Sequence, residues 1–270
     1  MADRILVRLP KELEYVLPAI AVTQGYITRL IDQANAGQRQ KECWVQIELQ
    51  DESHMFLSPM MDRLEWVVWD GREPRRWDWD CVLDFRSTDR ALRLASTTGK
   101  HIIEAWGGMV GAITLKVPYA GYLKFRLREP TVEILIDERV ECCQQLARYV
   151  KNNHAWANVW VKNLGGMRVA DVFNCLNKVG IYVGPRSGES YLAATMGKAL
   201  LELYSMDMPL WWLRKPACDI YRVVYRGDFP AEIVWCELEE IWQTMYASKN
   251  LEGLGFVGVP ESTVGSAVGR

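Results

Sequence analysis

Short apolar runs alternate with segments of helical periodicity along most of the chain. In the first half, apolar runs predict strands at Ile5–Leu9, Trp44–Leu49, Leu64–Trp69, Cys81–Phe85 and His101–Glu104. Apolar residues recur at helical spacing from Glu12 to Ala34 and from Ser87 to Thr97, which predicts two helices. Pro10 and Gly37 bracket the first helix as start and stop signals, and Ser87-Thr88-Asp89 opens the second as an N-cap.

The alternation resumes after a less regular stretch, Gly107–Pro130, in which glycine, proline and aromatic residues crowd together. Beyond it, strands are predicted at Val132–Ile136, Trp156–Val161, Ile181–Val183, Leu200–Tyr204 and Ile220–Val224. Helices are predicted at Glu138–Lys151, Val169–Leu176, the stretch that follows Gly188, and Ala231–Tyr246. The pattern predicts an α/β protein with mainly parallel sheets, with domains at residues 1–129 and 130–249 and a Gly/Ser/Val-rich tail at 250–270.

Composition narrows the class of protein. Apolar residues make up 49% and charged residues 24% of the 270 positions, which favours a packed globular protein. Lys and Arg number 32 against 34 for Asp and Glu, so no global field draws the chain to nucleic acid or to a membrane. The seven cysteines show no metal-binding spacing, which favours reduced and mostly buried thiols. With a charged N-terminus and no membrane-length apolar run, the sequence predicts a cytoplasmic protein without a membrane span.

One stretch carries candidate chemistry: residues 182–205 read YVGPRSGESYLAATMGKALLELYS. An apolar run ends there in the loop sequence Gly-Pro-Arg-Ser-Gly, immediately before a predicted helix. A loop of this kind presents unpaired backbone N–H groups and the positive end of a helix dipole, which suit a phosphate. Turn residues in an ordinary connection explain the same letters, and both interpretations stay open on this stretch alone.

Aromatic residues suggest a second kind of contact. Trp66, Trp69, Trp77 and Trp79 surround a basic turn, and aromatics interleaved with arginines can stack on bases or sugars. A strand buried on both faces explains Trp66 and Trp69 equally well.

Three stretches together resemble the heptosyltransferases of glycosyltransferase family 9. The chain begins ILVRLPKELEYVLPAI, in which Leu17-Pro18-Ala19 stands where the family has Leu-Pro-Ala. Residues 80–87, DCVLDFRS, resemble the family's D-x-V-I-D-L-[QR]-G-S, and residues 186–199, RSGESYLAATMGKA, resemble D-S-G-x-x-H-L-A-A-A-L-G-K-P. The resemblance implies a compact, divergent GT-B-like architecture, in which two Rossmann-like domains face a cleft.

Four positions depart from the family's pattern. Arg186 stands for the family's acid before Ser-Gly, and Tyr191 stands for its histidine. In the first loop, Lys11 replaces the glycine and Glu12 replaces the aspartate that follows it.

The resemblance implies a metal-independent transfer of a sugar from a nucleotide sugar to an acceptor hydroxyl, with no separate cofactor. Glu12 would be the general base, with Glu14 as its rival, and an ordinary first-turn acid is the alternative interpretation of Glu12. The nucleotide and phosphate residues implied are Arg186, Ser187, Gly188, Glu189 and Lys198. For Lys198 a helix-ending cation is the favoured alternative.

On the acceptor side the resemblance points to Lys11, Asp84 and Arg86. Arg86 would bind an acceptor phosphate or carboxylate, or would form a salt bridge across its loop. The acceptor itself is left undefined: a glycan, a protein or a modified nucleic acid supplies the hydroxyl equally well, and a homo-oligomer is compatible with the sequence. A second hypothesis is a catalytically silent binding or structural subunit with the same fold, because the motif's acid and histidine are replaced.

Overall fold

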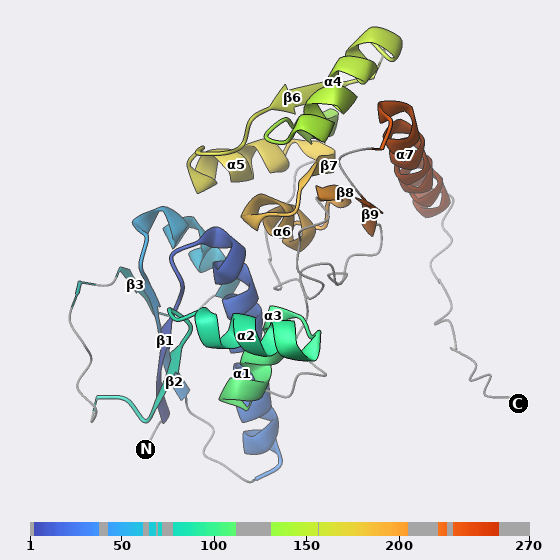
Figure 1. The fold of residues 1–270 in the computed structure, drawn as a ribbon. Coiled ribbons are helices and arrows are strands. Elements are labelled where there is room, and N and C mark those ends of the chain that lie inside the picture. The colour runs from blue at the N-terminus through green and yellow to red at the C-terminus, as the bar shows by residue number, and fades with distance from the viewer. Residues whose placement is uncertain are drawn as a thin grey trace, which may run out of the picture.

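The computed structural model describes residues 3–37, 43–61, 65–68, 70–71, 78–111, 131–155, 157–204, 221–225 and 229–253. Within them, each half of the chain forms one parallel sheet (Figure 1). The first sheet has the order β3-β2-β1-β4 and consists of β1 (Asp3–Arg8), β2 (Cys43–Leu49), β3 (Glu65–Val68) and β4 (Cys81–Asp84). The second has the order β6-β5-β7-β8-β9 and consists of β5 (Val132–Asp137), β6 (Val159–Lys162), β7 (Val179–Pro185), β8 (Ala199–Tyr204) and β9 (Tyr221–Tyr225).

Helices connect the strands, as parallel pairing requires. The first half contains α1 (Leu13–Asn35), the 3₁₀ segment η1 (Glu52–Met61), α2 (Asp89–Thr98) and α3 (Ile102–Val110). The second half contains α4 (Glu141–Asn153), α5 (Val169–Leu176), α6 (Gly188–Thr195) and α7 (Ala231–Gly253). The predicted strands and helices are confirmed at nearly every position, with shifts of a few residues at their ends.

The predicted strand at His101–Glu104 is wrong, because these residues begin helix α3. His101 is the N-cap: its Nδ1 accepts a hydrogen bond from the Ile103 N–H, and the Glu104 carboxylate accepts one from the His101 N–H. This is a capping box with an unusual first residue. By contrast, Thr88 caps α2 without a side-chain hydrogen bond, so the predicted cap lacks its usual contact.

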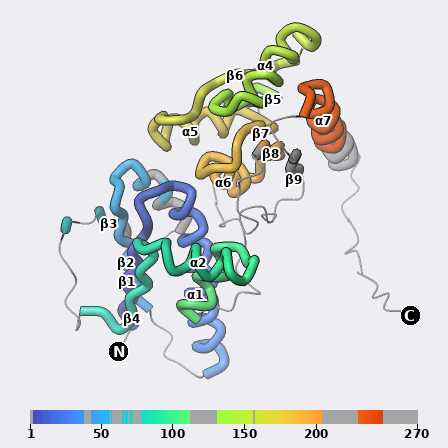
Figure 2. The backbone as a smooth tube through the Cα atoms, in the orientation of Figure 1, coloured from blue at the N-terminus to red at the C-terminus, as the bar shows by residue number. Residues whose placement is uncertain are grey.

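The central strands β5 and β7 of the second sheet are buried on both faces, and their residues alternate between two hydrophobic clusters. Ile134, Ile136, Ile181 and Val183 face α4 and α7, whereas Leu135 and Tyr182 point to the opposite side. Figure 2 shows α7 beside α4, on the side of this sheet away from α1. Near-continuous burial along β5 and β7 explains why these strands read as unbroken apolar runs.

The cluster on the opposite face continues into the first half of the chain. Leu135, Tyr182 and Leu200 belong to the same buried cluster as Ile5, Val7 and Ile20, and α6 packs directly on α1. A buried hydrogen bond of 2.6 Å joins His101 Nε2 of the α3 cap to Tyr191 Oη of α6. The two halves therefore share one of the two hydrophobic clusters.

Several sequence interpretations fall outside the described residues. These are the boundary near residue 130, the basic turn at 72–76, the side chains of Trp66, Trp69 and Trp77, and most of the predicted tail. Helix α7 continues to Gly253, so the first residues assigned to the tail are helical. Trp79 stacks on Trp44 at 5.3 Å between ring centroids.

The cysteines are only partly as expected. The six described cysteines are free, in agreement with reduced thiols. Cys143 and Cys175 are buried, but Cys43 and Cys236 are exposed, so the prediction of mostly buried thiols is wrong for this part of the chain. Cys218 lies outside the described residues.

The bond between His101 and Tyr191 gives the first prediction. Because Nδ1 of His101 accepts from a backbone N–H, a neutral ring carries its proton on Nε2 and donates it to Tyr191 Oη. Tyr191→Phe removes this buried hydrogen bond and should lower the free energy of unfolding by about 1–3 kcal/mol. Denaturant titration measures the change. Tyr149→Phe on α4 is the control, expected to stay within about 0.5 kcal/mol of the parent; equal losses in both variants would contradict the assignment.

Candidate functional site

Two strand-to-helix turns meet where the carboxyl ends of the two sheets face each other. Lys11 and Glu12 lie between β1 and α1, and Arg186 and Ser187 lie between β7 and α6. A Cβ added to Gly188, the first residue of α6, would lie 2.8 Å from the Glu14 backbone nitrogen and 2.9 Å from Leu13 Cβ. Only glycine permits this approach, so the first turns of α1 and α6 are in direct contact.

Ser187 caps α6 and is already engaged by other side chains. Its hydroxyl accepts a bond of 3.4 Å from the Ser190 N–H, and the Ser190 hydroxyl accepts one of 3.0 Å from the Ser187 N–H. Arg139, from the turn after β5, donates to Ser187 Oγ and to Glu189 Oε2, each at 3.0 Å. Arg139 is therefore the basic side chain that contacts the N-terminus of α6.

Buried acceptors fix the position of Arg139. Asp137, at the end of β5 and fully buried, accepts hydrogen bonds from Arg139 Nε at 2.8 Å and from Tyr182 Oη at 3.1 Å. The Leu164 N–H, from the turn after β6, donates to its second oxygen at 3.2 Å. Burial disfavours the charge of Arg139, but the hydrogen bond to Asp137 and the charges of Glu189 and Asp137 hold its pKa above the ordinary value.

Arg186 is turned into the protein. Its Nη1 lies 3.4 Å from Glu202 Oε2, with both side chains almost fully buried, and its guanidinium lies over the Tyr191 ring, 5.5 Å from the ring centroid. Burial raises the pKa of Tyr191 to about 12. Lys198 is also buried, and this desolvation lowers its pKa. Contacts of Arg186 or Lys198 with a diphosphate stay predictions.

The turn before α1 brings acidic side chains to the same junction. Glu12 is exposed and occupies the N-cap position without a side-chain capping bond. Burial raises the pKa of Glu14, a hydrogen bond with Tyr15 lowers it, and the charges of Glu12 and Glu189 raise it further. Carboxylates from both halves thus act on one another here, and the rival base, Glu14, has the perturbed pKa.

The remaining acceptor-side residues lie at the carboxyl edge of the first sheet. Arg86 donates to Asp84 in a bidentate arrangement along one guanidinium edge, with Nε at 3.0 Å from Oδ1 and Nη2 at 2.6 Å from Oδ2. These bonds hold the pKa of Asp84 below its usual value despite burial. Nearby, buried Arg8 contacts Glu48 at 2.7 Å. The salt bridge expected as one interpretation of Arg86 is present, and an acceptor anion on Arg86 stays a prediction.

A histidine also lies at this edge. His54 in η1 is 2% exposed, and its Nδ1 has no hydrogen-bond partner in the part of the chain that the structure describes. Burial lowers the pKa of His54, while the charges of Asp51 and Glu12 raise it by less. η1 packs on α5, so His54 belongs to a segment that touches the second half.

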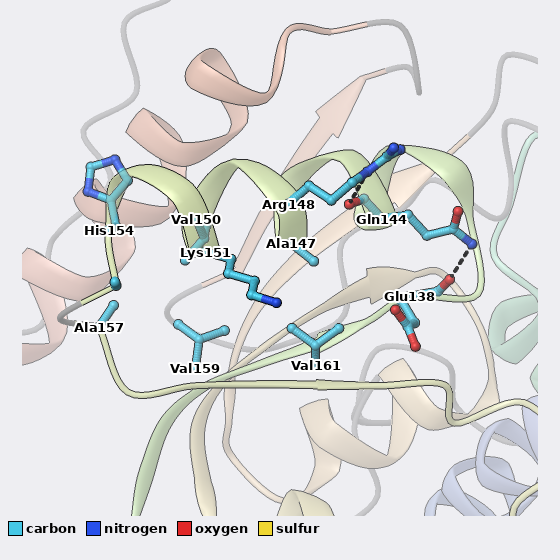
Figure 3. Close-up of a pocket in the computed structure, with 11 residues that line it drawn as sticks. Glu138, Gln144, Ala147, Arg148, Val150, Lys151, His154, Ala157, Val159 and Val161 are labelled. Carbon is cyan, nitrogen blue, oxygen red and sulfur yellow. Dashed lines mark hydrogen bonds between the residues drawn. The ribbon is translucent and has the colours of Figure 1, made fainter.

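A groove of about 620 Å³ lies elsewhere, between α4 and the edge strand β6 (Figure 3). Val159 and Val161 form its floor, Ala147 and Val150 contribute from α4, and Lys151 reaches over the valines. None of the residues that the sequence assigned to the site lines this groove.

Two kinds of feature are absent from the described residues. These residues contain no group of three or more His, Cys, Asp or Glu side chains placed to hold a metal ion. No helix among them combines the length and the apolar character needed to cross a membrane.

The structure thus brings together Lys11, Glu12, Ser187, Gly188 and Glu189 at the junction of the halves. Asp84 and Arg86 lie at the edge of the first sheet, and Arg186 and Lys198 lie inside the second half. Sequence reasoning missed Arg139 and Asp137, although a strand ending Asp-Glu-Arg before a helix is a signal for the ligand edge of a parallel sheet. His54 carried no recognisable signal.

Comparison with known proteins gives matches of structure alone. No protein-family model and no curated protein sequence matches the chain. Escherichia coli ADP-heptose lipopolysaccharide heptosyltransferase II superposes with a TM-score of 0.63 at 14% identity, over 90% of this chain and 99% of that chain. E. coli heptosyltransferase WaaC with ADP gives 0.56 at 13% identity, over 88% and 99%.

A third similar structure is TibC, an iron-containing dodecameric glycosyltransferase of enterotoxigenic E. coli. It superposes with a TM-score of 0.57 at 11% identity, over 82% of this chain and 65% of that chain. Such low identities establish a likeness of fold. The predicted GT-B-like architecture, and its resemblance to the heptosyltransferases, are confirmed at that level.

The buried pair of Arg186 and Glu202 gives the second prediction. Arg186→Ala leaves the Glu202 carboxylate buried without this cation and should lower the free energy of unfolding by about 3–5 kcal/mol. The double variant Arg186→Met with Glu202→Leu removes both charges and should recover most of that loss. Denaturant titration of the parent and both variants measures it. A single variant as stable as the parent would show that the pair is not structural.

Proposed function

We propose that this protein transfers a sugar from a nucleotide sugar to an acceptor hydroxyl. The observation that carries the proposal is the position of Arg139 at the N-terminus of α6, the helix that packs against α1 and its preceding turn with Glu12, in a GT-B-like fold. Open parallel sheets bind ligands beyond the carboxyl ends of their strands, and both sheets contribute such ends here. The proposed location is the cytoplasm.

On the donor side, the diphosphate would take the place of Glu189 as the anionic partner of Arg139. Backbone N–H groups of Gly188 and Glu189 would add hydrogen bonds at the positive end of the α6 dipole. Arg139 would then stabilise the charge that develops on the leaving diphosphate as its bond to the sugar breaks. Asp137 orients this guanidinium and keeps it in place before the donor arrives.

On the acceptor side, we assign the general base to Glu12. A bond forms between the acceptor oxygen and the anomeric carbon while the carbon–oxygen bond to the diphosphate breaks, and the hydroxyl proton passes to the Glu12 carboxylate. Glu12 makes no capping bond that would hold its side chain away from a substrate. Glu14 is the competing candidate, because burial raises its pKa above the ordinary value, as is common for catalytic carboxylates.

Donor binding requires the two turns to separate. Leu13 and Glu14 lie against Gly188 in this structure, where the diphosphate would have to sit. Opening and closing of two domains around a ligand is a common step in enzymes of two-domain architecture. Closure over the bound donor would bring Glu12 to the sugar and exclude water from the reaction.

We propose further that the reaction needs neither a metal ion nor a separate cofactor. The positive charge that a metal would supply to the leaving group would come from Arg139 and the helix dipole. The similar structure TibC is described as containing iron, so the metal requirement needs a direct test.

A second candidate function is a silent binding or structural subunit. Arg186 stands where the resemblance expects an acid and is committed to Glu202, and the α6 terminus is covered by α1. Both observations are compatible with a protein that has kept the GT-B-like architecture and lost the ability to bind a nucleotide sugar. The tests below separate this alternative from the enzyme.

Arg139→Ala tests the donor site. A charge-assisted hydrogen bond contributes about 1.5–3 kcal/mol, so nucleoside diphosphate affinity should fall roughly ten- to a hundredfold. The affinity for the corresponding nucleoside should change much less, since it lacks the phosphates. Isothermal calorimetry measures both ligands, with Arg148→Ala on α4 as the control. A parent that binds no member of a nucleoside diphosphate panel favours the silent subunit.

Glu12→Gln tests the base. The amide keeps the size of the side chain but accepts no proton, so transfer should fall about 10²–10⁴-fold while donor affinity is retained. Glu14→Gln is the matched variant, expected to do much less, because two residues along a helix turn a side chain by about 200°. Sugar transfer is measured with a panel of nucleotide sugars. The same assay tests metal independence, because EDTA should leave the transfer rate unchanged. The reverse ranking of the two variants would move the base to Glu14.

A further inference from the structure

His54 has an unusual combination of burial and missing contacts. Its Nδ1 is shielded from solvent and lacks a hydrogen-bond partner among the described residues, although its backbone N–H is bonded to the Asp51 carbonyl at 3.1 Å. Leaving a buried polar atom unpaired destabilises a folded protein. A position that retains such an atom beside a candidate site suggests a ligand that completes the pairing.

The position of His54 connects it to the acceptor side. η1 follows β2, so it begins at the same carboxyl edge of the first sheet as the turn that carries Glu12. The charges of Glu12 and Asp51 act on the imidazole, and burial outweighs them, so the ring is neutral near pH 7.

The charges at this edge limit the class of ligand. Among the described residues there, Arg8 pairs with Glu48 and Arg86 pairs with Asp84, so each arginine already has a carboxylate. Glu12, Glu14 and Asp51 add further negative charge, while Lys11 adds one positive charge. The described charges at this edge therefore favour an uncharged acceptor over an anionic one.

We propose that His54 is an acceptor-binding residue, whose Nδ1 hydrogen-bonds an uncharged polyhydroxyl acceptor beside the hydroxyl that reacts at Glu12. This inference rests on the proposed function and names its acceptor class. A hydroxyl both donates and accepts, so it satisfies Nδ1 in either tautomer of the neutral ring. A carboxylate or phosphate only accepts, and it would also face the acidic side chains.

Access to His54 and access to the donor site are linked. η1 packs on α5 of the second half, just as the first turn of α1 packs on Gly188 of α6. Separation of the halves would remove cover from both places. The acceptor would thus reach Nδ1 in the same open state that admits the donor.

The direct test uses the small number of histidines in the chain. His54, His101 and His154 are its three histidines, so ¹⁵N-histidine labelling gives few imidazole signals, and the spectrum of His54→Gln assigns those of His54. Glucose, glycerol and N-acetylglucosamine are titrated beside their phosphate esters. At least one neutral compound should shift the Nδ1 resonance more than its phosphate ester does. No shift with any neutral compound, or an equal or larger shift with the esters, would overturn the inference.

Variants of His54 provide a second test that separates function from structure. His54→Phe removes the unpaired atom, so its melting temperature should equal or exceed that of the parent, yet its KM for the neutral acceptor should rise about three- to tenfold. His54→Gln retains a hydrogen-bonding group and should stay within about twofold of the parent KM. Donor affinity should be unchanged in both, and His154→Gln is the control. A KM for His54→Phe equal to that of the parent would overturn the inference.

Failure of the proposed function gives a different result. In that case the parent binds no nucleotide sugar and transfers nothing, whichever way the imidazole signals respond to neutral sugars. The NMR titration therefore tests whether His54 binds a neutral sugar even when no turnover occurs. Calorimetry with nucleotides tests the donor site separately.

Discussion

The contact between Gly188 and the first turn of α1 sets the arrangement of everything around it. Two helix N-termini, each following a central strand of its own sheet, approach so closely that a single methyl group would not fit between them. This approach places Glu14 of one half near Glu189 of the other, which is an ion-pair partner of Arg139. The buried bond between His101 and Tyr191 also joins the two halves, and Nδ1 of His54 has no hydrogen-bond partner among the described residues.

Charge is divided unevenly across this contact. The second half contributes the guanidinium of Arg139, held by the buried carboxylate of Asp137. The described residues of the first half contribute mainly acids here, and Arg8 and Arg86 are each paired with a carboxylate. Such a division suits a reaction in which one substrate carries two phosphates and the other must lose a proton. Glu189 connects the two groups of charges, because it forms an ion pair with Arg139 and its charge raises the pKa of Glu14.

The alternation of apolar runs was sufficient to predict the two sheets and most connecting helices. Strands buried on both faces appear as unbroken apolar runs, which differ clearly from the helical spacing of the segments between them. The alternation failed at His101–Glu104, where β-branched residues suggested a strand and a histidine served as the helix cap. The motif stretch correctly located α6, but the direction of Arg186 depended on Glu202, sixteen residues later and on a neighbouring strand. Arg139 and His54 were missed because their importance comes from contacts between distant segments, and local sequence patterns do not encode such contacts.

The hydrophobic cluster shared by the halves affects how the protein folds. Leu135 and Tyr182 of the second sheet pack in one cluster with Ile5 and Ile20 of the first half, so neither half completes its own core. Each half produced separately would expose an apolar face and would tend to associate. The chain should therefore melt in a single cooperative transition, and the surface that we propose opens for a substrate is the same surface on which folding of the whole molecule depends.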